Sequence, residues 1–128
     1  MIQAYLLYFN TNIMKIQAEV IHLNNENSDI LSAELKKHLN ASGYDFIDYS
    51  KDIAIIIDDH GFEKELNPVF EVVSDYGDVN QLAGKLLFVR NIENKFSVDI
   101  GSIKYEDIFS LRINLSIKLI GITKKEQG

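Results

Sequence analysis

The sequence predicts an α+β protein: a single domain with a mostly antiparallel sheet of about five to seven strands and two to three helices packed on it. Segments in which apolar residues alternate are interleaved with segments that have helical spacing. With one Pro and seven Gly in 128 residues, no linker-like stretch divides the chain. The chain is long enough to bury one self-sufficient core, so we expect residues 1–128 to form one domain.

The chain is expected to begin with two strands, residues 2–9 and 13–23, joined by a turn over residues 10–12. This turn contains two Asn residues, which tolerate positive φ. Residues 1–13 are either the first strand of this hairpin or an extension, because Met14 is a second plausible start.

The apolar N-terminus is not expected to direct the protein to a membrane. Residues 1–9 lack the basic n-region of a secretory signal. They also fall short of the roughly 20 residues that a membrane-spanning helix needs. The chain has no Cys, which excludes disulfides and thiolate metal sites and fits a reducing compartment. We therefore expect a cytoplasmic protein.

A helix is expected over residues 29–41. Ser28 is a suitable N-cap, and leucines recur at spacing four from Leu31 to Leu39. Gly43 follows as the residue after the C-terminal end.

Two strands and a turn follow. In residues 44–49, aromatic or apolar residues alternate with acids, which is typical of a half-exposed strand. Residues 53–57 form a continuous apolar run and predict a strand buried on both faces. The turn over residues 58–61 ends at Gly61.

The second half is expected to open with a helix, because Pro68 after Asn67 matches the preference for Pro at the first helical position. The strict alternation of five apolar residues from Leu111 to Leu119 predicts the last strand. The expected elements are a helix from Asn67-Pro68 to Tyr76-Gly77, a loop over 78–84, a hairpin of strands 85–90 and 95–100, a short helix over 102–109, a strand over 111–119 and a frayed tail over 123–128.

Part of the chain resembles a small domain of unknown function found in phage and plasmid proteins. The matching features are the apolar strand at Ile55-Ile56-Ile57, the acidic turn Asp58-Asp59-His60-Gly61, the segment Leu66-Asn67-Pro68 and the strand from Gly84 to Val89. Residues 14–50 fit the strand–helix–strand opening of that family. The resemblance covers about residues 14–90 and implies a mobile-element setting, with no activity or catalytic residue to carry over. The N-terminal hairpin and the long final strand depart from the family pattern.

The distribution of charge predicts the kind of partner. The net charge is −6, and residues 45–78 alone contain ten acids and two Lys. With 13 basic residues against 19 acids, direct nucleic-acid binding is not expected. Acids beside Tyr residues are typical of a protein interface that faces a basic surface. The predicted partner-binding residues are Tyr44, Asp45, Asp48, Tyr49, Asp52, Glu63, Glu65 and Glu71.

A divalent metal or small ligand bound at the turn after the apolar strand is the alternative. Asp58, Asp59, His60 and Glu63 could supply oxygen ligands and one imidazole. Their spacing matches no standard metal motif. The sequence contains no nucleophile elbow and no phosphate-binding loop, so we expect no catalytic residue, no cofactor and no enzyme activity.

Together these observations predict a non-catalytic acidic protein-binding module that docks on a basic surface of a host protein. Lys outnumbers Arg by 11 to 2, a usage typical of AT-rich genomes, which fits a phage or mobile-element accessory protein of a low-GC bacterium. Such a protein could inhibit its target, in the extreme form by imitating the phosphates of DNA. A homodimer through paired strand edges stays open.

Overall fold

The computed structural model describes residues 1–93 and 98–124 and has an α+β fold with two antiparallel sheets. The first half contains β1 (Ile2–Asn10), β2 (Lys15–Leu23), α1 (Ser28–Leu39), β3 (Tyr44–Asp48), β4 (Ile53–Asp58) and the 3₁₀ turn η1 (Gly61–Glu63). The second half contains β5 (Pro68–Val73), β6 (Val79–Ala83), β7 (Leu86–Glu93), β8 (Val98–Gly101), α2 (Tyr105–Asn114) and β9 (Ser116–Ile122). The α+β class is confirmed. The expected sheet of about five to seven strands is corrected to two sheets, which together contain nine strands in the described ranges.

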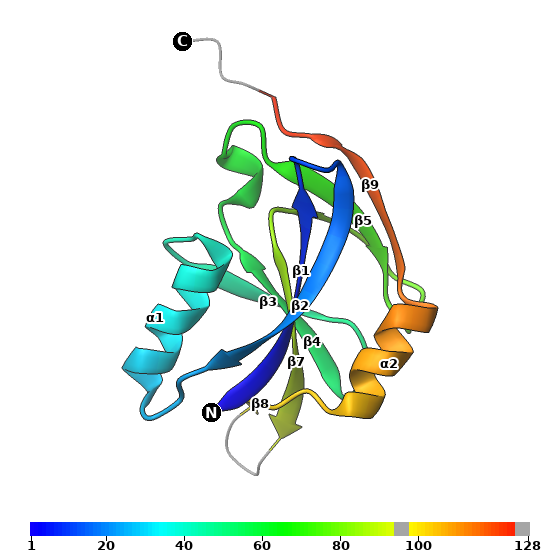
Figure 1. Cartoon of the computed structure of the whole chain (residues 1–128). Coiled ribbons are helices and arrows are strands. Elements are labelled where there is room, and N and C mark those ends of the chain that lie inside the picture. The colour runs from blue at the N-terminus through cyan, green and yellow to red at the C-terminus, as the bar shows by residue number, and fades with distance from the viewer. Residues whose placement is uncertain (94–97, 125–128) are drawn as a thin grey trace.

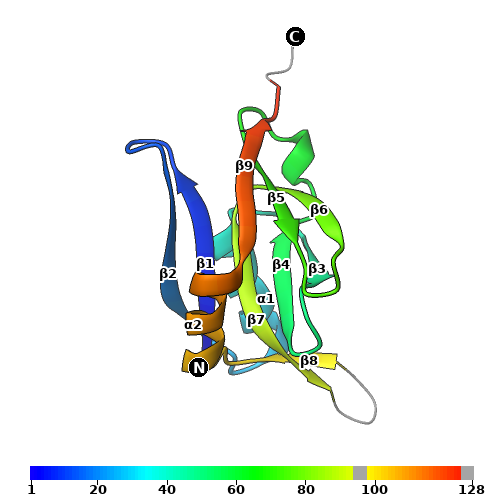
Figure 2. The ribbon, with the colours of Figure 1, turned by 90° about the vertical axis from the view of Figure 1, so that its right-hand side faces the viewer.

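The larger sheet forms the middle layer of the molecule. Its strand order is β2-β1-β7-β4-β3, and β8 extends it by pairing with β7. α1 covers one face, and the smaller sheet, of order β6-β5-β9, lies with α2 on the other (Figure 1; Figure 2). Helices therefore lie on both sides of the larger sheet.

Two hydrophobic cores lie on the two faces of the larger sheet. One contains Leu35 and Leu39 of α1, and the other contains Phe70 of β5 and Leu111 of α2. On β4, Ile55 belongs to the second core and its neighbour Ile56 to the first. Because consecutive strand residues point to opposite faces, this confirms that β4 is buried on both sides.

The first helix is confirmed, with a different N-cap. Asn27 has extended backbone angles, and its Oδ1 accepts a hydrogen bond of 2.9 Å from the backbone N–H of Ile30. Ser28, the expected cap, is already the first helical residue. The helix ends at Asn40, whose φ of 52° lies in the left-handed region that Asn tolerates. The stop therefore comes before Gly43.

The helix expected from Asn67 is a strand, β5, and this prediction was wrong. The Asn67 side chain does not cap a helix; its Nδ2 donates to the carbonyl of Gly61 at 2.9 Å. Phe70 and Val72 alternate into the core, and Glu71 between them points outward. Pro68 is tolerated because it is the first residue of the strand. The residues expected to form a loop after it include β6, which pairs with β5 along its whole length.

The last strand was also misplaced, since its expected first residues belong to α2. Ile108 and Leu111 lie three residues apart on the buried side of this helix. Ile113, one of the five alternating residues, is exposed on the helix. Only the later part of the alternation forms β9, which pairs with β5.

The remaining strand predictions are confirmed in outline. β1 and β2 form the expected hairpin, paired from Ile2–Leu23 to Asn10–Lys15. β7 and β8 also pair, although β7 continues to Glu93, past the expected turn. Residues 94–97 and most of the expected frayed tail, 125–128, lie outside the described residues.

Candidate functional site

The predicted acidic interface begins on β3, at the far edge of the larger sheet from β2. Asp45 and Asp48 are both exposed, but they lie three positions apart on the strand and point to opposite faces. Tyr44 is half-buried, and its hydroxyl donates to Ser32 of α1 at 3.2 Å. The strand therefore does not present its acids as one row.

Tyr49 does not reach the surface. It is 5% exposed, and its ring packs edge-on against Phe88 with centroids 6.1 Å apart. Burial, the negative charge of Asp75 and a hydrogen bond to that carboxylate raise the pKa of the Tyr49 hydroxyl. This residue supports the fold and cannot serve as a surface anchor.

Tyr76, and not Tyr49, is an exposed Tyr that can serve as a surface anchor. It lies in the β5–β6 turn and is 60% exposed. The hydroxyl oxygen of Ser74 accepts hydrogen bonds from the backbone N–H groups of Tyr76 and Asp78 and so holds this turn in shape. The sequence signal was present as a Tyr between two acids, but the expectation of a helix there concealed it.

Two acidic turns meet beside Tyr76. The backbone N–H of Asp75 donates to the carbonyl of Tyr49 at 2.9 Å, which joins the β5–β6 turn to the β3–β4 turn. We call this surface the acidic turn pair. Its members are all exposed: Asp48, Asp52, Asp75, Tyr76 and Asp78. It contains the predicted residues Asp48 and Asp52, together with two acids that were not assigned to the interface.

The other predicted partner-binding acids lie elsewhere. Glu63 and Glu65 are exposed at and just after η1, on the β4–β5 connection. Glu71 is half-buried on β5, and its Oε2 lies 3.0 Å from the Nζ of Lys118 on β9. The ten acids therefore do not gather on one face.

Asp58 is engaged within the protein. It is buried, and its Oδ2 lies 2.6 Å from the Nζ of Lys64. Its Oδ1 accepts a hydrogen bond of 2.9 Å from the backbone N–H of His60. The carboxylate therefore neutralises Lys64 and orders the turn.

The other three candidate ligands are the imidazole of His60 and the two carboxylates that flank it, and they do not converge on one point. Nδ1 of His60 lies 3.0 Å from Glu63, and Nε2 lies 3.6 Å from Asp59. Because the two carboxylates lie at different ring nitrogens, a cation at one nitrogen is far from the carboxylate at the other. Within residues 1–93 and 98–124, no group of three or more such side chains is arranged to hold a metal.

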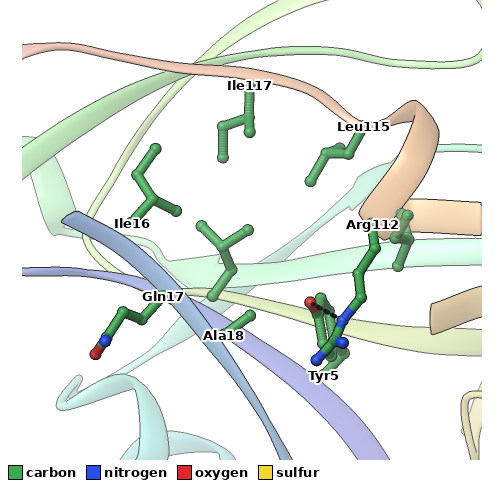
Figure 3. Close-up of a pocket in the computed structure, with 9 residues that line it drawn as sticks. Tyr5, Ile16, Gln17, Ala18, Arg112, Leu115 and Ile117 are labelled. Carbon is green, nitrogen blue, oxygen red and sulfur yellow. Dashed lines mark hydrogen bonds between the residues drawn. The ribbon is translucent and has the colours of Figure 1, made fainter. Parts of the chain in front are cut away.

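A cleft of about 330 Å³ opens between β2 and the α2–β9 segment (Figure 3). Ile16 on β2 faces Leu115 and Ile117 across it, and Nε of Arg112 donates to the Tyr5 hydroxyl at 3.3 Å. The described residues that line it include neither a carboxylate nor an imidazole, so they offer no acid–base pair. Its residues come from four separate segments, which is why no local sequence signal marks it.

A scan against protein-family models finds no match, and comparisons with curated proteins and with solved structures find none either. The resemblance to a phage and plasmid domain therefore stays a prediction. The two α-helices in the described ranges are too short to cross a membrane.

Proposed function

We propose that this chain is a non-catalytic protein-binding module that docks on a basic surface of a partner through the acidic turn pair. The observation that carries the proposal is that the exposed Tyr76 lies on a turn joined by a backbone hydrogen bond to the β3–β4 turn, and that both turns carry exposed acids. Tyr is a frequent anchor of interfaces because it buries a large rigid surface and keeps a hydrogen-bonding group. Carboxylates around it would accelerate association with a cationic surface.

The geometry favours docking over imitation of DNA. A phosphate mimic needs carboxylates in a regular series along one face. Here Asp45 and Asp48 point to opposite faces of β3, and Glu71 is paired with Lys118. The mobile-element setting and a host target remain what the sequence resemblance predicts, and an inhibitory effect would follow if the partner's basic surface is its working site.

A pair of matched double variants tests this proposal. Asp48→Asn with Asp78→Asn removes two charges from the acidic turn pair, and Glu63→Gln with Glu65→Gln removes two exposed charges from the β4–β5 connection. Both variants have the same net charge. Tagged wild-type and variant proteins are used to capture partners from a low-GC bacterial lysate at low and high salt.

We expect one protein to be retained at low salt by the wild type and by the Glu63/Glu65 variant, and released by high salt. The Asp48/Asp78 variant should fail to capture this protein because it lacks the two charges, and Tyr76→Ala should fail because it lacks the aromatic anchor. Equal capture by all four proteins would contradict the proposed surface. Capture lost only in the Glu63/Glu65 variant would move the interface to the β4–β5 connection.

A further inference from the structure

β2 is an open edge of the larger sheet. It pairs with β1 over all nine residues without a register shift, and no other described strand pairs with its outer side. In Figure 2, β2 forms the left margin of the molecule. Edge strands of monomeric proteins are commonly short, bulged or interrupted by Pro. β2 is nine residues long with no bulge and no Pro, and its charged residues are Lys15 at one end and Glu19, so most of its outer backbone can accept another strand.

The same edge carries apolar side chains that the fold leaves uncovered. Ile16, Ala18 and Val20 point to the face that β5 and α2 cover elsewhere, yet Val20 is 42% exposed. Beside it, Tyr105, Phe109 and Ile113 form a stripe along α2 with exposed fractions of 83%, 63% and 64%. Val20, Tyr105 and Phe109 line a shared hollow of about 160 Å³. The uncovered apolar surface thus extends from the strand onto the helix, with Arg112 as a charged residue in the lining of the same hollow.

We propose that β2 pairs antiparallel with β2 of a second copy of this chain, about a two-fold axis at Ala18. In this register Ile16 lies opposite Val20 of the second copy and Ala18 lies opposite its counterpart, so apolar residues meet on the uncovered face. The hairpin tip of each copy extends toward the α2 stripe of the other. Its exposed Ile13 and Met14 are suited to cover that stripe.

The charges on the opposite face of β2 favour a second copy of this chain as the partner at this edge. With the axis at Ala18, Lys15 lies diagonally across from Glu19 of the second copy, and the pair occurs twice by symmetry. Moving the axis to Glu19 would place two like charges directly opposite each other. The edge is therefore self-complementary in charge as well as in the placement of its apolar residues. β3, at the other edge, has exposed Asp45 and Asp48 and would meet its own copy with like charges.

This dimer goes beyond the proposed function and does not depend on it. The sheet order places β2 and β3 at opposite edges, so pairing through β2 leaves the β3 edge of each copy at the outer ends of a continuous sheet. A dimer would present two acidic turn pairs. The docking proposal could fail while the dimer stands, and the reverse is equally true.

Sedimentation velocity of the full chain across micromolar concentrations tests the dimer. We expect wild-type protein to sediment with twice the 14.6 kDa mass of one chain at the upper end of the range. Val20→Lys should be monomeric throughout, because it places a charge against Ile16 of the second copy. The control is Val79→Lys on β6, where the wild-type side chain is 60% exposed and the change in charge is the same. This variant should dimerise like the wild type.

Exchanging the charges of Lys15 and Glu19 tests the register without changing Ile16, Ala18 or Val20 on the other face of β2. Lys15→Glu and Glu19→Lys should each weaken the dimer at least several-fold, and the double variant should regain it, because the diagonal pairs are restored with reversed sign. A circular dichroism spectrum unchanged from wild type shows that each variant is folded. A wild-type protein that stays monomeric, or a Val20→Lys variant that dimerises, would overturn the proposal. Failure of the double variant to recover would overturn the register.

Discussion

Asp107 is an acid that the sequence does not distinguish from surface acids, yet it is buried and stabilises the fold. It is buried at the N-terminus of α2, where it accepts hydrogen bonds from Nε and Nη2 of Arg90 at 2.8 and 2.9 Å. The backbone N–H of Lys104 donates a third at 2.8 Å. Burial alone would raise the pKa of Asp107, but these hydrogen bonds and the charge of Arg90 outweigh it and lower the pKa below its ordinary value of 3.8.

We expect Asp107→Asn to lower the free energy of unfolding by about 2 kcal/mol at pH 7, because it removes charge-assisted hydrogen bonds from Arg90 in a part-buried site. The contribution of the carboxylate is complete above the unfolded pKa and is lost as the pH falls through the lower folded pKa. The difference in free energy of unfolding between variant and wild type should therefore become smaller below pH 4. Urea titrations at neutral and acidic pH check this, and a gap independent of pH would show that the charge is not responsible.

The turn after β4 gives a second prediction at the scale of single residues. Asp58 is paired with Lys64, and the carboxylates of Asp59 and Glu63 lie at different nitrogens of His60. Thermal melts with added Mg²⁺, Mn²⁺, Ca²⁺ or Zn²⁺ should therefore leave the unfolding midpoint unchanged, because only an ion bound by the native state raises it. A rise that disappears in Asp59→Asn would support the metal-binding alternative.

At the scale of elements, local signals were sufficient where a segment's own residues decide its structure. The β1–β2 hairpin and α1 could be predicted because turn residues, alternation and the leucine spacing all agree. β5 could not, because Asn67-Pro68 is a good helix start in isolation. Its β-branched residues form a strand because β6 and β9 pair with it on both sides. Pairing between distant segments overrides local preference here.

The same distinction explains what could be predicted of the candidate site. That the segment around Asp48 and Asp52 is acidic and exposed follows from composition. Its contact with the β5–β6 turn depends on the backbone hydrogen bond from Asp75 to Tyr49, and no local sequence pattern indicates that these two distant residues meet. The burial of Tyr49 and the exposure of Tyr76 depend on the same packing. An alternating strand pattern alone could not tell which Tyr would face solvent.

The N-cap of α1 provides a prediction for this element. Asn27→Ala should reduce the free energy of unfolding by about 1 kcal/mol, because the N–H of Ile30 loses its side-chain acceptor. Ser28→Ala is the control, since Ser28 lies within the helix and Ala is a favourable helical residue. Chemical denaturation of both variants measures the difference. A larger loss for Ser28→Ala would mean that Ser28 is the cap.

At the scale of the whole molecule, β7 links the two hydrophobic cores. Leu87 points into the core beneath α1, and Phe88 points into the core beneath β5 and α2. Both side chains are fully buried, although they are adjacent in the sequence. We therefore expect a loss of packing in either core to weaken the other through this strand.

We expect Leu87→Val and Phe88→Leu each to destabilise the protein by about 1 kcal/mol and each to preserve a single unfolding transition. Tyr fluorescence and far-UV circular dichroism should report the same urea midpoint within each variant. Two separated transitions in the Phe88→Leu variant would contradict the coupling, because they would show that one core can be lost while the other persists.

The position of β1 inside the larger sheet, between β2 and β7, has a consequence for how quickly the chain folds. β1 pairs with β7, and the backbone of Gln3 is held by Ser102, 99 residues further along the chain, at 2.9 Å. Contacts between such distant segments incur their loop-closure entropy before they return any energy, so chains rich in them fold slowly. During synthesis the β1–β2 hairpin must wait, with its apolar residues open to solvent, until β7 has been made. A nascent chain of this protein is therefore vulnerable to aggregation until β7 has been made.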